Sequence, residues 1–187
     1  MSDFYINVIQ YGNQLLVREF DNGKRVNRRI TFEPTLYVES RKNSKWKTLE
    51  GRNVEPVRFK SIRDAKDFLN MHQNTPELVH GLDAFQYVYI GDKYPDFINW
   101  DMAKLLLITL DIEVESENGF PDAQKADEKL LCITVKNHSN KAIIVWGIGP
   151  YENDKVRYIE CENELDLIKK FIHFWHKTQP DVITGWN

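Results

Sequence analysis

The chain has 187 residues, of which 42% are hydrophobic and 28% are charged, and these values are ordinary for a folded protein. This length accommodates one large domain or two small ones. No run of 18 apolar residues occurs, which excludes a membrane-spanning helix, and the first residues lack the pattern of a signal peptide. The two cysteines, Cys132 and Cys161, have no metal-type spacing and indicate reduced thiols in a cytoplasmic protein.

Charge is distributed unevenly along the chain. The net charge is −3, but residues 24–66 carry 13 basic side chains against 5 acidic ones, which gives this segment a charge of +8. Such an excess binds nucleic-acid phosphates with release of counterions, or it forms a solvated basic surface. The candidate nucleic-acid contacts in this segment are Arg28, Arg29, Lys45 and Lys47.

Aromatic residues within the same basic segment allow two interpretations. They could stack on single-stranded bases between the basic side chains, or they could pack in the core of a small sheet. These residues are Tyr37, Trp46 and Phe59.

The first hundred residues predict a sheet and one helix. Asn22-Gly23 predicts a tight hairpin turn because both residues tolerate a positive φ. Pro34 indicates an edge strand or a bulge, and Ser61 with Asp64 three residues later predicts the start of a helix. The expected elements are strands at 4–11, 14–20, 28–39 and 84–90 and a helix at 61–72.

We place a domain boundary near residue 102, because residues 93–101 contain Pro95 and show no periodicity. The second part predicts a three-stranded meander, followed by a helix that crosses to a further buried strand, which is typical of an α/β domain. Its expected elements are strands at 105–114, 129–136, 142–148, 156–160 and 181–184 and a helix at 164–177.

Two acidic residues follow the long apolar run 105–110, which is typical of a strand that is buried on both faces. Side chains two apart on a strand point to the same face, so Asp111 and Glu113 are expected to project together. A divalent cation with oxygen ligands, Mg²⁺ or Mn²⁺, would neutralise such a pair. The alternative is a strand end with two solvated acids.

The motif Asp111-Ile112-Glu113 and, about seventy residues later, Thr184-Gly185-Trp186-Asn187 together resemble family B DNA polymerases. The first segment is similar to the first exonuclease motif of that family, and the second is similar to the opening of the second motif. Four further segments resemble the replicative polymerases of T-even-type bacteriophages, and the resemblance is co-linear over essentially the whole chain. These segments are 3–5, 21–24, 119–122 and 161–164.

The resemblance implies a two-domain fold that combines α+β and α/β architecture. Residues 1–102 would form the N-terminal sheet-plus-helix domain, and residues 103–187 would form the first part of a ribonuclease-H-like 3′→5′ exonuclease domain. The polymerising domains and the later exonuclease motifs are not in the chain. We therefore expect a fragment that ends inside the exonuclease domain and is inactive on its own.

The parent protein implied by the resemblance is a DNA-directed DNA polymerase that replicates phage DNA in the host cytoplasm and proofreads by two-metal hydrolysis with Mg²⁺ or Mn²⁺. Asp111 would bridge both metals, and Glu113 would bind one and orient the attacking water. Phe120 would pack on the terminal base, unless it is a loop residue of the core. Asn187 would contact the primer end, unless it is a turn residue at the strand end.

The partners implied by the resemblance are primer-template DNA and a single-stranded 3′ end. RNA is a further candidate ligand of the N-terminal domain, and a sliding clamp would bind only through a C-terminal region outside this chain. No membrane partner is expected. A rival hypothesis is a stand-alone single-stranded nucleic-acid-binding module in which the acidic strand end is structural and the basic segment binds the ligand.

Overall fold

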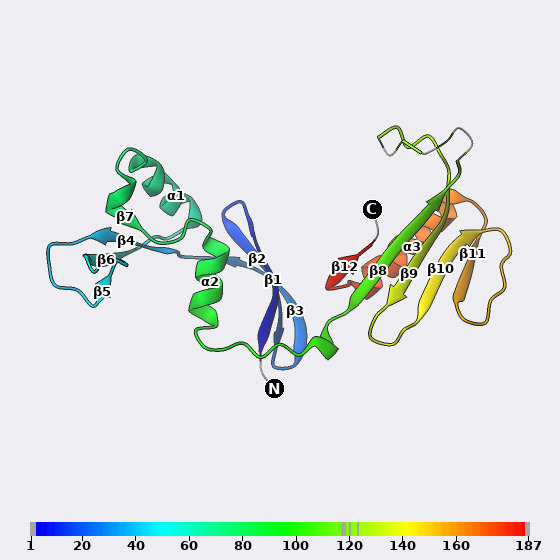
Figure 1. Ribbon diagram of the computed structural model, residues 1–187, viewed down its shortest axis with the longest axis horizontal. Coiled ribbons are helices and arrows are strands. Elements are labelled where there is room, and N and C mark those ends of the chain that lie inside the picture. The colour runs from blue at the N-terminus through cyan, green and yellow to red at the C-terminus, as the bar shows by residue number, and fades with distance from the viewer. Residues whose placement is uncertain (1–2, 117–118, 120, 123, 186–187) are drawn as a thin grey trace. The chain divides into compact units, whose positions relative to one another are not determined.

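The computed structural model describes residues 3–116, 119, 121–122 and 124–185. It divides into two compact units, Met1–Trp100 and Asp101–Asn187 (Figure 1). We describe each unit by itself. No helix of the described residues is long and apolar enough to cross a bilayer.

The first unit begins with an antiparallel sheet in the order β1-β2-β3. Its strands are β1 (Phe4–Tyr11), β2 (Gln14–Asp21) and β3 (Lys24–Thr31). Asn22 and Gly23 connect β2 to β3 with φ values of 50° and 75°. This positive-φ pair matches the right-handed twist of the two strands, so the predicted hairpin turn is confirmed.

The single strand expected at 28–39 is wrong, because the chain changes sheet at Pro34. A second sheet has the order β5-β6-β4-β7. Pro34 is buried without an N–H to donate to a strand ladder, and its carbonyl oxygen accepts a hydrogen bond of 2.9 Å from the Phe59 N–H. The strands of the second sheet are β4 (Thr35–Glu39), β5 (Trp46–Lys47), β6 (Asn53–Arg58) and β7 (Val79–His80).

The first unit also contains two α-helices, of which one was expected. Helix α1 (Ile62–Met71) begins where Ser61 Oγ accepts a hydrogen bond of 3.2 Å from the Asp64 N–H, as the capping pattern predicted. The strand expected at 84–90 is instead α2 (Phe85–Lys93). A short 3₁₀ helix, η1 (Pro76–Leu78), precedes β7.

Helix α2 forms despite its β-branched and aromatic composition because one helical face joins the core. Phe85 is completely buried, and Val88 and Tyr89, three and four residues later, pack against the same core. Burial of this stripe outweighs the strand propensity of the individual residues. The buried members of this core cluster are Val8, Leu15, Val17, Leu36, Ile62, Ala65 and Phe85.

The second unit has one five-stranded sheet and one α-helix, after a short 3₁₀ helix η2 (Met102–Lys104). The sheet order is β11-β10-β9-β8-β12, in which β8, β9 and β10 form an antiparallel meander. Strand β11 pairs in parallel with β10, and β12 pairs in parallel with β8. The elements are β8 (Leu107–Val114), β9 (Leu130–Asn137), β10 (Ile143–Ile148), β11 (Arg157–Cys161), α3 (Glu164–Thr178) and β12 (Val182–Thr184).

Helix α3 covers one face of this sheet and carries the chain from one edge to the other (Figure 1). Its N-terminus is capped by Asn163, whose Oδ1 accepts a hydrogen bond of 3.0 Å from the Asp166 N–H. Side chains of β8, β9, β10, β11 and α3 form the core between helix and sheet. The buried members of this core are Ile108, Ile133, Val135, Trp146, Cys161 and Leu167.

The expectations that the run 105–110 is buried on both faces and that β12 is a buried strand are wrong for this structure. Ile108 is the buried residue of β8. On the other face of this strand, Leu107 and Thr109 are partly covered and the two acidic residues are exposed. On β12, Val182 and Ile183 are 41% and 51% exposed. Helix α3 covers one face of the sheet only. The apolar run at 105–110 therefore belongs to a strand that is paired on both edges, with β9 and β12, and covered on one face.

Candidate functional site

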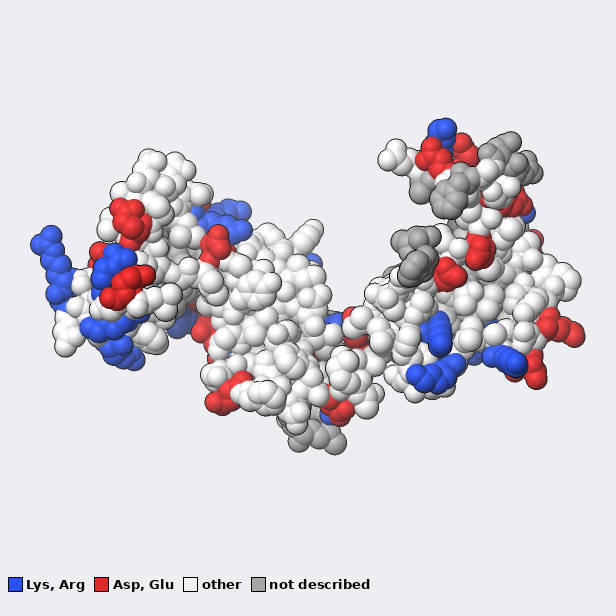
Figure 2. All heavy atoms as spheres, in the orientation of Figure 1, with Lys and Arg blue, Asp and Glu red and all other residues white. Residues whose placement is uncertain are grey.

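The sheet face opposite α3, which we call the open face, carries the two acidic residues of the predicted metal site. Asp111 and Glu113 lie two apart on β8 and therefore point to the same side. On β9, Thr134 pairs with Asp111 and Cys132 pairs with Glu113. In Figure 2, acidic side chains lie within this face, and basic side chains lie toward its lower border. The structure thus places the acids side by side.

The two carboxylates are exposed and influence the neighbouring thiol. Burial raises the pKa of Cys132, and the negative charges of Glu113 and Asp111 raise it further. The thiol therefore stays protonated at neutral pH, and a neutral thiol is a poor ligand for hard cations such as Mg²⁺. The open face presents two hard carboxylate groups next to a neutral sulfur atom.

Strand β12 approaches β8 just before the acidic residues. Thr184 pairs with Thr109, and a Cβ atom on the following Gly185 would lie 2.8 Å from the Leu110 carbonyl oxygen. Glycine is required here because any side chain would collide with the backbone that leads into Asp111. The Thr-Gly part of the second motif therefore lies directly beside the acidic strand.

Other polar groups continue the open face toward the beginning of β8. Thr109 Oγ1 lies 2.7 Å from His138 Nε2, a hydrogen bond that holds the imidazole next to the strand. The His138 backbone N–H donates to the Leu107 carbonyl oxygen at 3.0 Å. Neither residue was singled out from the sequence as a site residue, because their contact depends on the pairing of β8 with β9.

The donor set fits one hydrated hard cation. Within the described ranges, no group of three or more His, Cys, Asp or Glu side chains is arranged to hold a metal ion. Asp111 and Glu113 alone provide oxygen ligands on one face, which suits Mg²⁺ because this ion accepts few protein ligands and retains several waters. Phe120 and Asn187, the other residues predicted for the exonuclease site, lie outside the described residues.

The four predicted basic contacts do not form one group, because two lie on the first sheet and two lie at the second. Arg28 is engaged within the protein and forms ion pairs with Glu19 and Asp21. The guanidinium of Arg29 lies 5.9 Å from the centroid of the Tyr11 ring. The charge of Arg28 is thus neutralised internally, whereas Arg29 lies on the exposed side of β3.

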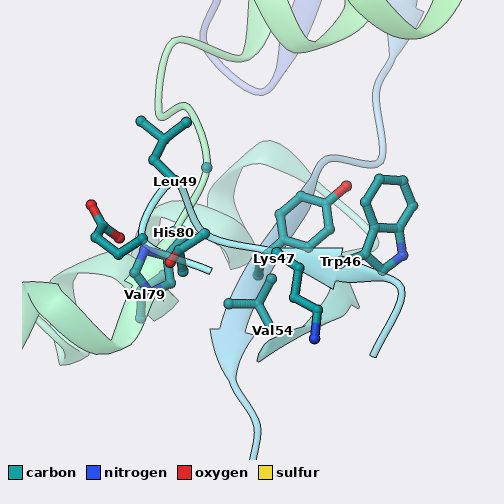
Figure 3. Close-up of a pocket in the computed structure, with 10 residues that line it drawn as sticks. Trp46, Lys47, Leu49, Val54, Val79 and His80 are labelled. Atoms are coloured by element: carbon teal, nitrogen blue, oxygen red, sulfur yellow. The ribbon is translucent and has the colours of Figure 1, made fainter. Parts of the chain in front are cut away.

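Lys45 and Lys47 lie beside an aromatic pair at the second sheet. Lys45 Nζ is 5.0 Å from the Trp46 ring centroid, and Lys47 Nζ donates to the Asn53 and Asn43 side chains. The Trp46 and Tyr37 rings lie 5.4 Å apart. Tyr37, Trp46 and Lys47 line a cavity of about 570 Å³ (Figure 3).

His80 completes this cavity and was missed by the sequence interpretation. Its Nε2 atom is buried, and no described residue forms a hydrogen bond with it. The nearest carboxylate oxygen, Glu39 Oε1, lies 3.8 Å away. No local pattern marks His80, since it comes from the two-residue strand β7 and reaches the cavity only through pairing with β4.

Comparison with known proteins agrees with the resemblance noted from the motifs. The family described as DNA polymerase family B, exonuclease domain, matches residues 84–187. This match includes both acidic residues of the open face and begins upstream of the second unit, at the residue before α2.

Two phage proteins and one viral protein are related to the chain. The DNA-directed DNA polymerases of Enterobacteria phage T4 and Escherichia phage RB69 are 28% and 26% identical, over alignments that cover 100% of this chain and 24% of each relative. The DNA polymerase catalytic subunit of Equine herpesvirus 2 (strain 86/87) is 30% identical over 43% of the chain. The chain spans about a quarter of the length of its phage relatives. Because the family match covers more than half of its residues, the chain belongs to DNA polymerase family B and contains sequence of the exonuclease domain.

Proposed function

We propose that the chain is the part of a proofreading, DNA-directed DNA polymerase that supplies the first acidic strand of its 3′→5′ exonuclease site. The observation that carries this proposal is the position of Asp111 and Glu113, side by side on the open face of an interior strand. Both residues lie within the range 84–187 that matches the exonuclease family. The substrate would be the single-stranded 3′ end of a primer, and the parent protein would act in the host cytoplasm.

The topology of the second unit supports a ribonuclease-H-like sheet for this proposed domain. The meander β8-β9-β10 leads through α3 to β12, which pairs in parallel with the first strand of the meander. This arrangement places the acidic strand inside the sheet, between β9 and the edge strand β12. We accordingly propose residues 1–102 as the N-terminal domain and residues 103–187 as the exonuclease part.

Asp111 and Glu113 would hold Mg²⁺ or Mn²⁺, with Asp111 shared between two ions and Glu113 orienting the attacking water. Bound divalent cations stabilise the attacking and leaving oxygens of phosphodiester hydrolysis. The protein contributes two negative charges that are fixed by the β8 ladder and exposed to solvent. Because the described site has two carboxylates, we expect the second ion to bind weakly.

Manganese binding tests the proposed metal site. Free Mn²⁺ is followed by electron paramagnetic resonance while the chain, its Asp111→Ala variant and an Asp154→Ala control are titrated. Asp154 is an exposed acid in the loop before β11, so its removal changes net charge equally and leaves both carboxylates of β8 in place. The proposal requires binding that is lost with Asp111→Ala and retained with Asp154→Ala. Equal binding by all three proteins would contradict it.

A single-stranded nucleic-acid-binding module is the second candidate function. The cavity formed by Tyr37, Trp46, Lys47 and His80 favours it, because aromatic faces next to cations bind unpaired bases. Fluorescence anisotropy with labelled single-stranded RNA and DNA would measure this binding. Loss of affinity with Lys45→Ala/Lys47→Ala, together with full affinity of Asp111→Ala, would support the module. The reverse result would reject it.

A further inference from the structure

Two tyrosines extend the open face away from the carboxylates. Tyr158 lies on β11, where it pairs with Val145 of β10. Its side chain leans over the neighbouring Gly147, since a Cβ atom on that glycine would lie 2.6 Å from Tyr158 Oη and 2.9 Å from Cε2. A glycine in the middle of a strand thus makes room for the phenol ring on the open face.

The Tyr158 ring is held in place, and a second ring packs against it. Tyr158 Oη donates a hydrogen bond of 2.6 Å to the Gly149 carbonyl oxygen. The Tyr151 ring centroid lies 5.3 Å from that of Tyr158, with 55° between the ring planes. Tyr151 is 52% exposed, and its Oη accepts a hydrogen bond of 3.0 Å from Asn153 Nδ2. We call this pair of rings the tyrosine platform.

The strand ladder fixes the separation between the platform and the carboxylates. Gly147, under the Tyr158 ring, pairs with Cys132, and Cys132 pairs with Glu113. Neighbouring strands lie roughly 4.8 Å apart, so two steps of the ladder correspond to roughly 10 Å. A stacked nucleic-acid strand rises about 3.4 Å per nucleotide, and about three nucleotides therefore span this distance.

We propose that Tyr151 and Tyr158 form a stacking site for a base of single-stranded DNA, about three nucleotides from the phosphodiester that cations bound at Asp111 and Glu113 would hold. This inference rests on the proposed exonuclease function for the position of the 3′ end. An exposed aromatic face binds any base, as a proofreading site must. The platform would position the strand and would not take part in bond cleavage.

An oligothymidylate with one 2-aminopurine near its 3′ end tests the platform. Stacking quenches 2-aminopurine fluorescence, so titration with the full chain reports both affinity and contact with a ring. The measurement is made in EDTA, and again in a D111N/E113Q background, in which no carboxylate at the site repels the phosphates. Both conditions prevent hydrolysis and make the result independent of metal binding.

The test variants separate stacking from folding. We expect Tyr151→Ala to weaken binding roughly 5- to 30-fold and to remove the quenching, whereas Tyr151→Phe retains both because it keeps the ring. Tyr158→Phe keeps its ring and loses the bond to Gly149, so its effect should be small. Tyr87→Ala is the matched control, because Tyr87 is a 60% exposed tyrosine on α2. Thermal unfolding followed by circular dichroism confirms that each variant is folded.

Two results would overturn the platform. One is equal affinity and quenching for Tyr151→Ala and Tyr151→Phe, which would show that the rings only pack over Gly147 and do not stack on a base. The other is the absence of quenching by the unaltered chain in both conditions. Either result leaves the manganese titration untouched, and failure of manganese to bind at Asp111 leaves the quenching test untouched. The two proposals therefore fail independently.

Discussion

Carboxylates occur in opposite environments in the two units of this chain. Glu19, on β2 of the first unit, is completely buried and is bound by Arg28, by Lys93 Nζ at 2.5 Å and by Tyr94 Oη at 2.8 Å. Asp111 and Glu113, on β8 of the second unit, are exposed. Within the described part of the chain, no basic side chain forms an ion pair with either of them.

The difference separates a structural acid from a candidate ligand site. Two cations and a phenol satisfy Glu19, so its charge is compensated inside the protein and it connects the end of α2 to the first sheet. The paired acids on β8 are exposed to solvent, and no described basic side chain forms an ion pair with either of them. Two carboxylates that share an open sheet face without an ion-pair partner are available to a hard cation.

Removal of the buried acid should have the largest effect on stability. Glu19→Ala would leave Arg28 and Lys93 without their shared carboxylate and would create a cavity, at a cost of about 3–5 kcal/mol in the free energy of unfolding. Urea unfolding followed by tryptophan fluorescence measures this loss. A change of less than about 1 kcal/mol would contradict the structural role of Glu19, and the buried acid would then not differ in this respect from the exposed acids of β8.

Tyr94→Phe should have an intermediate effect, because it removes one hydrogen bond to a charged group, worth about 1.5–3 kcal/mol. Burial is the main cause that raises the pKa of Tyr94 to about 12 from 10.0. An acid whose folded pKa lies above its unfolded value stabilises the fold below the unfolded pKa. This contribution should therefore be lost as the pH rises from 10 to about 12.

The pH dependence of unfolding in alkaline urea tests whether the contribution of Tyr94 to stability is lost as the pH rises. The unaltered chain should lose stability over the interval between the two pKa values, and the Tyr94→Phe variant should lose less over the same interval. Lys93 lies next to the same carboxylate, so tyrosinate absorbance is followed in parallel to assign the change to a phenol. Identical pH profiles for the two proteins would show that Tyr94 makes no such contribution.

Thiol reactivity should report the uncompensated charge on the open face with a smaller effect. After burial, the charge of Glu113 is the next cause that raises the pKa of Cys132. Glu113→Gln removes that charge, so the pKa should fall and alkylation of Cys132 at mildly alkaline pH should become a few times faster. Peptide mass spectrometry separates Cys132 from the buried Cys161, whose rate serves as the internal control. An unchanged or slower alkylation rate at Cys132 would contradict the expected fall of its pKa.

Local patterns predicted those parts of the fold that are determined by neighbouring residues. Asn22-Gly23 predicted a turn, and Ser61 predicted a helix start, because each depends on the backbone geometry of a few residues. The shared face of Asp111 and Glu113 follows from strand geometry in the same way. Helix α2 was not predicted, because burial of Phe85 against distant strands outweighs the local preference for a strand.

The surroundings of the candidate site could not be predicted, because they depend on strand register and on long-range contacts. Cys132 comes to lie beside Glu113 only through the pairing of β8 with β9. The tyrosine platform depends on the parallel pairing of β10 with β11. Likewise, Glu19 and Lys93 are 74 residues apart in sequence, and no pattern near either residue indicates their ion pair.

Substitution of an exposed acid on β8 should have the smallest effect on stability. Asp111→Asn keeps the size of an exposed side chain and relieves its repulsion with Glu113, so the free energy of unfolding should change by no more than about 0.5 kcal/mol, toward greater stability. Urea unfolding without divalent ions measures this change, and an Asp127→Asn variant on the exposed loop before β9, which changes the net charge by the same amount, is the control.

The sign of that change distinguishes the two interpretations of the acidic strand. A carboxylate retained for folding would lose stabilising contacts on substitution, as Glu19 does, and the variant would unfold at a lower urea concentration. A carboxylate retained for a ligand that is absent from the measurement has no such contacts to lose. Destabilisation by more than about 1 kcal/mol would therefore favour the structural role of the strand end that the nucleic-acid-binding hypothesis assumes.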